Sequence, residues 1–156
     1  MFIPKNLYFN GMKYLCLLLC LISVGAKAQV LFNEKYNDCI NGKPCYYCGD
    51  SMAQYKNRLN ERLQHSVDHG LHKWVGTSGH MYFEIEVDST GHSCVKSIKD
   101  EVHMADVKRS LKMCINGLYE WQPAISNGHS INSTLIIDIR FLDNRASINF
   151  VKPNDF

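Results

Sequence analysis

Residues 79–91 read GHMYFEIEVDSTG, and this stretch decides how the rest of the chain is arranged. Apolar and polar residues alternate strictly over residues 81–87, which predicts a strand with one buried side and one side facing solvent. Glu84 and Glu86 fall on the polar side, and we expect them to be ordinary solvent-facing residues. Residues 88–91 then predict a hairpin turn, because Gly91 can adopt a positive φ without steric cost.

Two further strands are expected beyond this turn. Residues 93–99 form the second strand of the hairpin, where the spacing of Val95 and Ile98 indicates a bulge. Asn127 and Gly128 predict another turn, and a long strand follows over residues 131–141. The inner face of this third strand carries Ile131, Leu135, Ile137, Ile139 and Phe141, and its outer face carries Asn132, Thr134, Asp138 and Arg140.

Two amphipathic helices complete the predicted elements. The first begins at Ser51, which forms a capping-box pattern with Gln54, and ends near Gly70. Its apolar stripe consists of Met52, Tyr55, Leu59, Leu63 and Val67. The second runs over residues 103–119, and its stripe consists of Met104, Val107, Leu111, Cys114, Ile115 and Leu118. Pro123 ends it, and Trp121 is expected to pack its end against the sheet.

These elements predict an α+β fold. Strands one and two form a hairpin, and the second helix crosses back so that strand three lies antiparallel beside strand one. The sheet has three strands in the order 2-1-3, with both helices packed on its apolar face. The predicted divisions of the chain are a signal peptide (1–28), a cysteine-containing segment (29–50), a helix with its connector (51–74), the main domain (75–145) and a tail (146–156).

The main domain resembles the C-terminal domain of TonB, the energy transducer of outer-membrane transport. The matching features are the sequence MYFEIEVD at 81–88, Gly91, Asp106, the sequence WQPA at 121–124, the turn at Asn127 and Gly128, and the strand that ends at Phe141. The resemblance covers about half of the chain after residue 28. The proline-rich spacer of TonB has no counterpart here, because Pro44 is the only proline between the leader and the domain. The resemblance therefore implies a peptide-binding surface more than force transduction.

The first 28 residues have the pattern of a leader. Lys13 precedes a short apolar run, and Ala26, Lys27 and Ala28 form a cleavage signature before Gln29. Either Met1 or Met12 can be the start. Without the leader, the 17 basic and 15 acidic residues become 14 and 15, so no basic character favours nucleic acid. We expect export to the periplasm of a Gram-negative bacterium, with or without association with the envelope.

Five cysteines remain after the leader, and an exported protein can form disulfides. Cys39, Cys45 and Cys48 are clustered, so we expect them to supply one disulfide, while Cys94 and Cys114 stay reduced in the core. Two alternatives stay open for the cluster. Cys45 and Cys48 have the spacing of zinc ligands, with Cys39 as a third, and they also have the spacing of a redox pair.

Metal and catalytic patterns are weak elsewhere. His65 and His69 lie one helical turn apart, with His72 nearby, and we expect this to be a solvated face rather than a metal site. No nucleophile elbow, phosphate loop or HExxH pattern occurs in the sequence. We therefore expect neither an enzyme nor a cofactor, and no small-molecule substrate is evident.

The edge of the third strand is the predicted functional site. The resemblance implies that an extended peptide of an outer-membrane TonB-dependent transporter, or of another envelope protein, adds to this edge as a strand. The expected contacts are Asn132, Thr134, Ile136, Asp138, Arg140 and Trp121. Two other outcomes stay open. Residues 147–151 can themselves form a strand that covers this edge, and the protein can instead handle metals or thiols through the cysteine cluster and the face of His65, His69 and His72.

Overall fold

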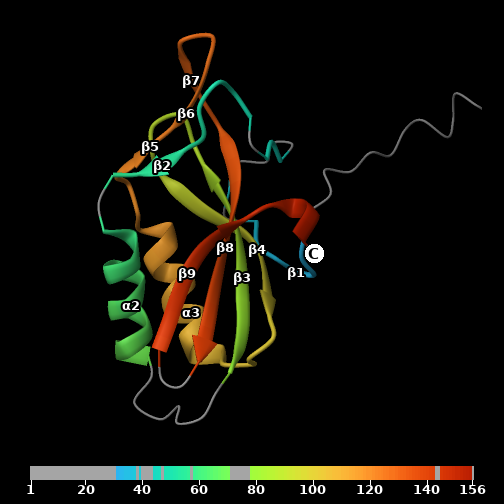
Figure 1. Cartoon of the computed structure of the whole chain (residues 1–156), viewed down its shortest axis with the longest axis vertical. Coiled ribbons are helices and arrows are strands. Elements are labelled where there is room, and N and C mark those ends of the chain that lie inside the picture. Colours follow the sequence, from blue (N-terminus) through green and yellow to red (C-terminus); the bar gives the residue numbers. More distant parts are fainter. Residues whose placement is uncertain are drawn as a thin grey trace, which may run out of the picture.

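The computed structural model describes residues 31–37, 39, 44–46, 48–56, 58–70, 78–142 and 145–155 (Figure 1). The predicted leader, its cleavage site and His72 lie outside these residues, and so does the side chain of His69. No helix in the described part of the chain combines the length and the apolar character that crossing a membrane requires.

An antiparallel sheet of five strands forms the centre of the molecule, in the order β1-β4-β3-β8-β9. The hairpin pairs β3 (Gly79–Val87) with β4 (Ser93–Asp100), and β8 (Ser133–Leu142) lies on the other side of β3. The predicted order 2-1-3 corresponds to β4-β3-β8. The prediction of three strands was wrong, however, because β1 (Glu34–Lys35) and β9 (Arg145–Val151) extend the sheet at its two edges.

The turn and the bulge of the hairpin form as the sequence predicts. Gly91 has a φ of 91°, and its amide donates to the carbonyl of Asp88 over 3.1 Å. The register shifts between Glu84 and Ile85, whose partners in β4 are Ser97 and Val95, so that Lys96 is the extra residue. The bulge explains why the apolar residues of β4 do not alternate.

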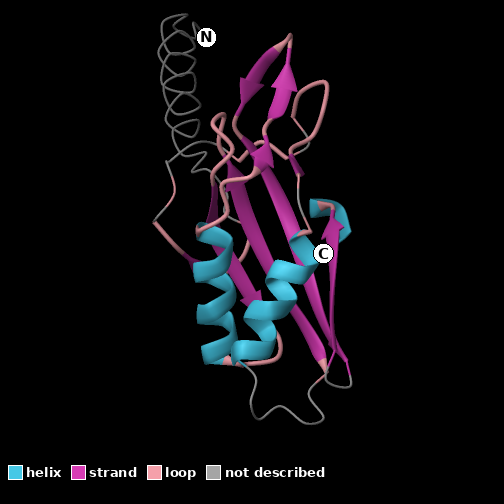
Figure 2. Ribbon diagram, turned by 90° about the vertical axis from the view of Figure 1, so that its left-hand side faces the viewer, coloured by secondary structure: helices cyan, strands magenta, loops and turns pink. Residues whose placement is uncertain are grey.

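Both helices pack on one face of the sheet (Figure 2). The second, α3 (Ala105–Asn116), lies within its predicted range, and its stripe is buried at Val107, Leu111 and Ile115. The first, α2 (Leu59–Gly70), buries Leu59, Leu63 and Val67 as predicted. With Met81, Phe83, Ile85 and the inner residues of β8, these side chains form one continuous core.

The start of α2 differs from the prediction. Residues 50–56 run extended because residues 120–125 supply their hydrogen bonds. β2 (Gln54–Tyr55) pairs with β5 (Trp121–Gln122), and the amide of Asp50 donates to the carbonyl of Ile125 over 2.6 Å. Ser51 bridges to Ile125 instead of capping a helix. Tertiary pairing therefore overrides the local capping pattern.

A small hairpin extends from the sheet after β5. It consists of β6 (Ala124–Ser126) and β7 (His129–Ile131), joined by Asn127 and Gly128 with φ values of 50° and 76°. Two consecutive residues with positive φ are characteristic of the tight turn that the Asn-Gly dipeptide predicts. The described chain ends with the short helix η1 (Pro153–Asp155).

The outer face of the sheet is covered, which corrects the prediction for Glu84 and Glu86. Glu84 is completely buried and Glu86 is buried as well. The backbone amide of Leu31 and the hydroxyl groups of Tyr46 and Ser97 donate to the carboxylate of Glu84. Burial raises the pKa of Tyr46, and the neighbouring Glu84 carboxylate raises it further. The acidic residues of this alternating strand thus belong to a buried polar network on the outer face of the sheet and do not face solvent.

Trp121 is 2% exposed and packs edge-on against Tyr55, with ring centroids 5.1 Å apart. We predict that Trp121→Ala lowers the free energy of unfolding by about 3–5 kcal/mol, the usual range for truncating a buried large aromatic side chain. Chemical denaturation measures this loss. Tyr119, which is 63% exposed, provides the matched control, and Tyr119→Ala should change the stability by about 0.5 kcal/mol or less. Equal losses in the two variants would contradict the structural role of Trp121.

Candidate functional site

The edge of β8 that the sequence offers as a binding site is already occupied. β9 pairs with β8 from Leu142, opposite Arg145, to Ile136, opposite Val151. The prediction of an open edge at Ile136, Asp138 and Arg140 is therefore wrong. The alternative, in which the tail covers the edge, is the arrangement found. The physical reason is that residues 145–151 alternate small or apolar residues with polar ones and follow β8 after only two residues, so a hairpin forms locally.

The remaining part of the β8 edge is covered by the cysteine-containing segment. The amide of Thr134 donates to the carbonyl of Cys45 over 2.9 Å, and the amide of Cys45 donates to Oγ1 of Thr134 over 3.3 Å. Thr134 is consequently buried. Asn132 is exposed directly before β8, where its side chain accepts from the amide of Ser89 and donates to Glu86.

The other predicted contact residues are also engaged within the domain. Asp138 is buried, and its carboxylate lies 2.8 Å from Nδ1 of His80 on β3. Arg140 is exposed on the outer face and is paired with Ser147 of β9. Trp121 is buried, yet its ring also packs edge-on against Phe150, with centroids 6.3 Å apart. Trp121 therefore supports the inner side of β9.

The strand at the outer edge of the sheet is β9, and no described strand pairs with its other side. Successive residues of a strand direct their backbone groups to opposite sides. The amide of Thr134 points away from β3, and residues 136, 138, 140 and 142 therefore direct their backbone groups toward β9. Their partners on β9 point back toward β8. The backbone groups of Ala146, Ile148 and Phe150 consequently point outward.

A groove of about 640 Å³ lies between this edge and α2. Ala146 and Ile148 face the helices and pack against the core, and they form the floor of the groove on the strand side. The helix side is lined by Asn60, Glu61, Gln64, His65 and Asp68. Figure 1 shows α2 and β9 next to each other at the same side of the molecule. The groove is thus bordered by the backbone edge of β9 on one side and by a row of side chains from α2 on the other.

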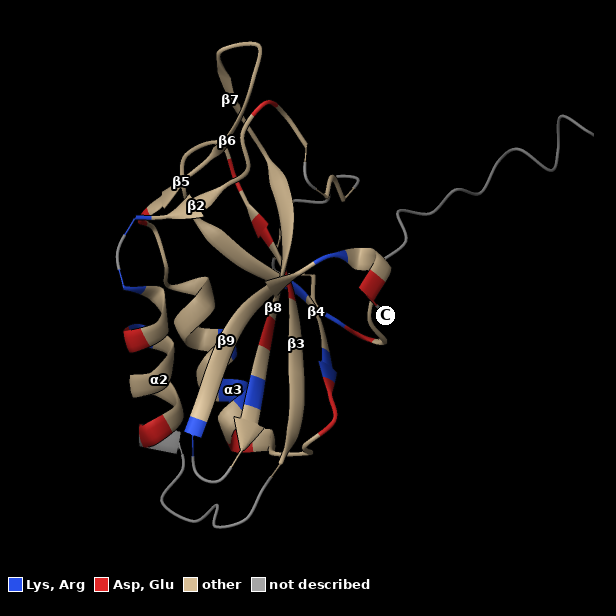
Figure 3. Cartoon of the chain, viewed as in Figure 1, with Lys and Arg blue, Asp and Glu red and all other residues tan. Residues whose placement is uncertain are grey.

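The groove carries negative charge. Its lining includes the carboxylates of Glu61 and Asp68 but neither lysine nor arginine. Glu61 forms an ion pair with Arg58 at 3.1 Å in which both side chains are well exposed, and Asp68 accepts a hydrogen bond from Gln64 over 2.8 Å. Arg58 offsets part of the charge of Glu61, whereas the partner of Asp68 is uncharged, so the lining of the groove keeps a negative balance. Figure 3 shows the acidic bands of α2 beside β9, whose single charged residue is Arg145.

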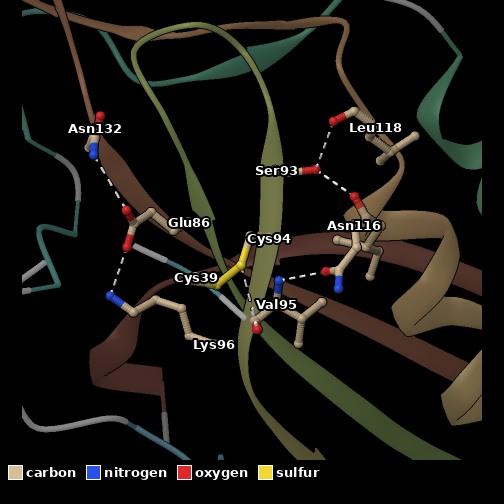
Figure 4. Close-up of a disulfide and its surroundings, with 10 residues drawn as sticks. Cys39, Glu86, Ser93, Cys94, Val95, Lys96, Asn116, Leu118 and Asn132 are labelled. Atoms are coloured by element: carbon tan, nitrogen blue, oxygen red, sulfur yellow. Dashed lines mark hydrogen bonds and ion pairs between the residues drawn. A yellow bond between two sulfur atoms is a disulfide. The ribbon is translucent and has the colours of Figure 1, made fainter. Parts of the chain in front are cut away.

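The cysteine cluster supplies one disulfide, and Cys114 is free, as the sequence predicts, but Cys39 forms a second bridge that the sequence does not predict. Cys39 is bonded to Cys94 and Cys45 is bonded to Cys48, while Cys114 is free. The expectation that Cys94 stays reduced was wrong because the N-terminal segment folds over the outer face of the sheet and brings Cys39 to β4. Figure 4 shows this bridge near the buried ion pair of Glu86 and Lys96, whose atoms lie 2.9 Å apart. Cysteine spacing alone does not reveal a pairing over 55 residues.

The metal candidates do not come together in the described part of the chain. His65 is exposed at the groove beside α2. No group of three or more histidine, cysteine, aspartate or glutamate residues with metal-binding geometry occurs among the residues that the structure describes. The alternative of a zinc site at Cys45 and Cys48 conflicts with their disulfide.

In comparisons with known proteins, the chain matches no family model, no curated protein and no solved structure. The resemblance to the TonB C-terminal domain therefore stays a prediction from the sequence.

The two disulfides should differ in their effect on stability. The bridge from Cys39 to Cys94 spans 55 residues and that from Cys45 to Cys48 only 3. Because a disulfide removes more conformational entropy from a longer unfolded loop, we expect a loss of about 4 kcal/mol for Cys39→Ser with Cys94→Ser. Cys45→Ser with Cys48→Ser should cost about 2 kcal/mol on the same basis. Urea unfolding of the two double variants measures both values, and the reverse order would contradict this assignment.

Proposed function

We propose that this protein is an exported peptide-binding domain that accepts an extended segment of an envelope protein along the free edge of β9. The observation that carries the proposal is the combination of outward-facing backbone groups at Ala146, Ile148 and Phe150 with a groove against α2. In strand addition, main-chain hydrogen bonds provide affinity, and the pockets for alternate side chains provide selectivity. The proposed site lies one strand beyond the edge that the sequence suggests.

The edge of β9 lacks several of the features by which proteins protect an exposed strand. Residues 145–151 contain no proline, and their pairing with β8 shows no register shift. The strand carries no lysine and only one arginine, at its first residue. Proline, bulges and charges are the usual means of blocking edge-to-edge pairing. An edge of seven residues without most of them supports a role in pairing with a partner.

The charge of the groove indicates the kind of peptide. Side chains of an added strand that point toward α2 meet the carboxylates of Glu61 and Asp68. An extended segment with lysine or arginine at alternate positions is complementary to this surface. Phe150, which is 49% exposed at the far end of β9, offers an apolar contact next to Trp121. The resemblance to TonB suggests the periplasmic segment of an outer-membrane transporter as the source of the peptide.

Proline at position 146 tests the proposal. Ala146→Pro removes an amide that points away from the sheet, and edge strands tolerate proline where the missing amide faces solvent. We predict that the variant stays folded but loses binding by at least about tenfold, because a main-chain hydrogen bond and the straight path of the edge are lost. The measurement is a titration of the labelled protein with lysine-containing peptides from periplasmic segments of outer-membrane transporters, followed by amide chemical shifts.

A matched control separates the backbone from the side chains. Asn149→Ala changes an exposed side chain of β9 that does not line the groove and leaves every amide in place, so its binding should equal that of the unchanged protein. Shifts that cluster on residues 145–151 and on the facing side of α2 support the site. Shifts that spare β9, or an Ala146→Pro variant that binds normally, would exclude it.

The acidic groove allows a separate test of selectivity. Replacing Glu61 and Asp68 by glutamine and asparagine keeps the shape of the side chains and removes two charges. Binding of a lysine-containing peptide should weaken by about two- to fivefold per charge, since exposed ion pairs contribute up to about 1 kcal/mol. The effect should disappear at high salt. An equal loss for a peptide without basic residues would show that charge does not select the partner.

A further inference from the structure

Hydrogen bonds to other parts of the chain hold the loop of Cys45 and Cys48 in position, in addition to the disulfide itself. On one side of the bridge, the backbone of Cys45 exchanges two hydrogen bonds with Thr134, and the hydroxyl of Tyr46 donates to the buried Glu84. On the other side, the amide of Ser51 donates to the carbonyl of Ile125 over 3.3 Å, and the amide of Ile125 donates to the carbonyl of Ser51 over 3.1 Å. The loop is therefore attached to the central sheet at Cys45 and to the small hairpin of β6 and β7 after the bridge.

Gly49 allows the second attachment. It follows Cys48 directly and has a φ of 88°, and a Cβ at this position would lie 2.3 Å from the carbonyl oxygen of Ile125. Only glycine permits so close an approach in this conformation. The chain is thereby turned onto β6 immediately after the second cysteine. The two sulfur atoms are kept close by the surrounding backbone, so the thiols should remain neighbours when the bridge is opened.

The two cysteines differ in access. Cys45 is exposed and Cys48 is half-buried. Thiol–disulfide exchange requires a thiolate to approach one sulfur of the bridge, and its rate depends on which sulfur is accessible. An incoming thiolate reaches Cys45 first, and Cys48 is then the sulfur that leaves and later closes the ring again.

We propose that Cys45 and Cys48 form a reversible thiol–disulfide exchange site whose partner is a protein dithiol, and that Cys39 and Cys94 form the permanent bridge. A partner thiolate attacks the sulfur of Cys45, which forms a mixed disulfide and releases Cys48 as a thiolate that takes up a proton. The second thiol of the partner then loses its proton and attacks the mixed disulfide. Cys45 leaves as a thiolate and is protonated. Two electrons and two protons have then passed to this protein, and the partner holds the new disulfide.

Redox titration tests the assignment. The folded protein is equilibrated with mixtures of reduced and oxidised dithiothreitol, the free thiols are alkylated in acid, and the peptides are mapped by mass spectrometry. We expect Cys45 and Cys48 to become fully reduced while Cys39 and Cys94 remain bonded and the circular dichroism spectrum is unchanged. Subsequent addition of oxidised glutathione should restore the bridge between Cys45 and Cys48.

Single-cysteine variants test the order of attack. In a background that carries Cys114→Ser, the variant Cys48→Ser leaves the thiol of Cys45, and Cys45→Ser leaves that of Cys48. Oxidised glutathione should modify Cys45 about tenfold faster than Cys48, because the former is the exposed member of the pair. The proposal is overturned if the short bridge opens only when the fold is lost, if Cys39 and Cys94 are reduced first, or if the two thiols react at the same rate.

Discussion

Glu84 lies in the middle of β3 without exposed surface, and three donors from different parts of the chain converge on its carboxylate. The donors are the amide of Leu31, the hydroxyl of Tyr46 and the hydroxyl of Ser97. A buried carboxylate requires such partners, because an unpaired polar group in the interior costs several kcal/mol. This requirement ties the N-terminal segment to the outer face of the sheet and makes β3 a strand that is covered on both sides.

The rest of the architecture follows from the way the N-terminal segment covers Glu84 on the outer face of the sheet. The N-terminal segment places Cys39 beside Cys94, brings β1 to the edge at β4, and lays the backbone of Cys45 along β8 at Thr134. Its phenylalanine, Phe32, packs against Tyr82 with ring centroids 6.1 Å apart. Helices α2 and α3 cover the opposite face. Because one edge of β8 is occupied by the segment and by β9, the free edge of the sheet is moved outward to β9, next to α2 and its carboxylates.

This arrangement separates two kinds of surface. The outer face holds a polar network and the disulfide between Cys39 and Cys94, which join the N-terminal segment to the sheet. The groove between α2 and β9 borders an exposed strand edge, and an unpaired strand edge can accept a further strand. In the loop of Cys45 and Cys48, Tyr46 belongs to the buried network while Cys45 is exposed.

The sequence by itself determined the elements whose signals are local: the alternating strand β3, the turn at Gly91, the bulge at Lys96, helix α3 with its stripe, and the turn at Asn127 and Gly128. It also predicted the neighbours β4-β3-β8, because an inner apolar face fixes which side of each strand must be buried. Only the tertiary structure decided the start of α2, the burial of Glu84, the partner of Cys94 and the strand that covers β8. Each of these depends on a segment distant in sequence, and the periodicity of a strand does not reveal what lies on its polar side or along its edge.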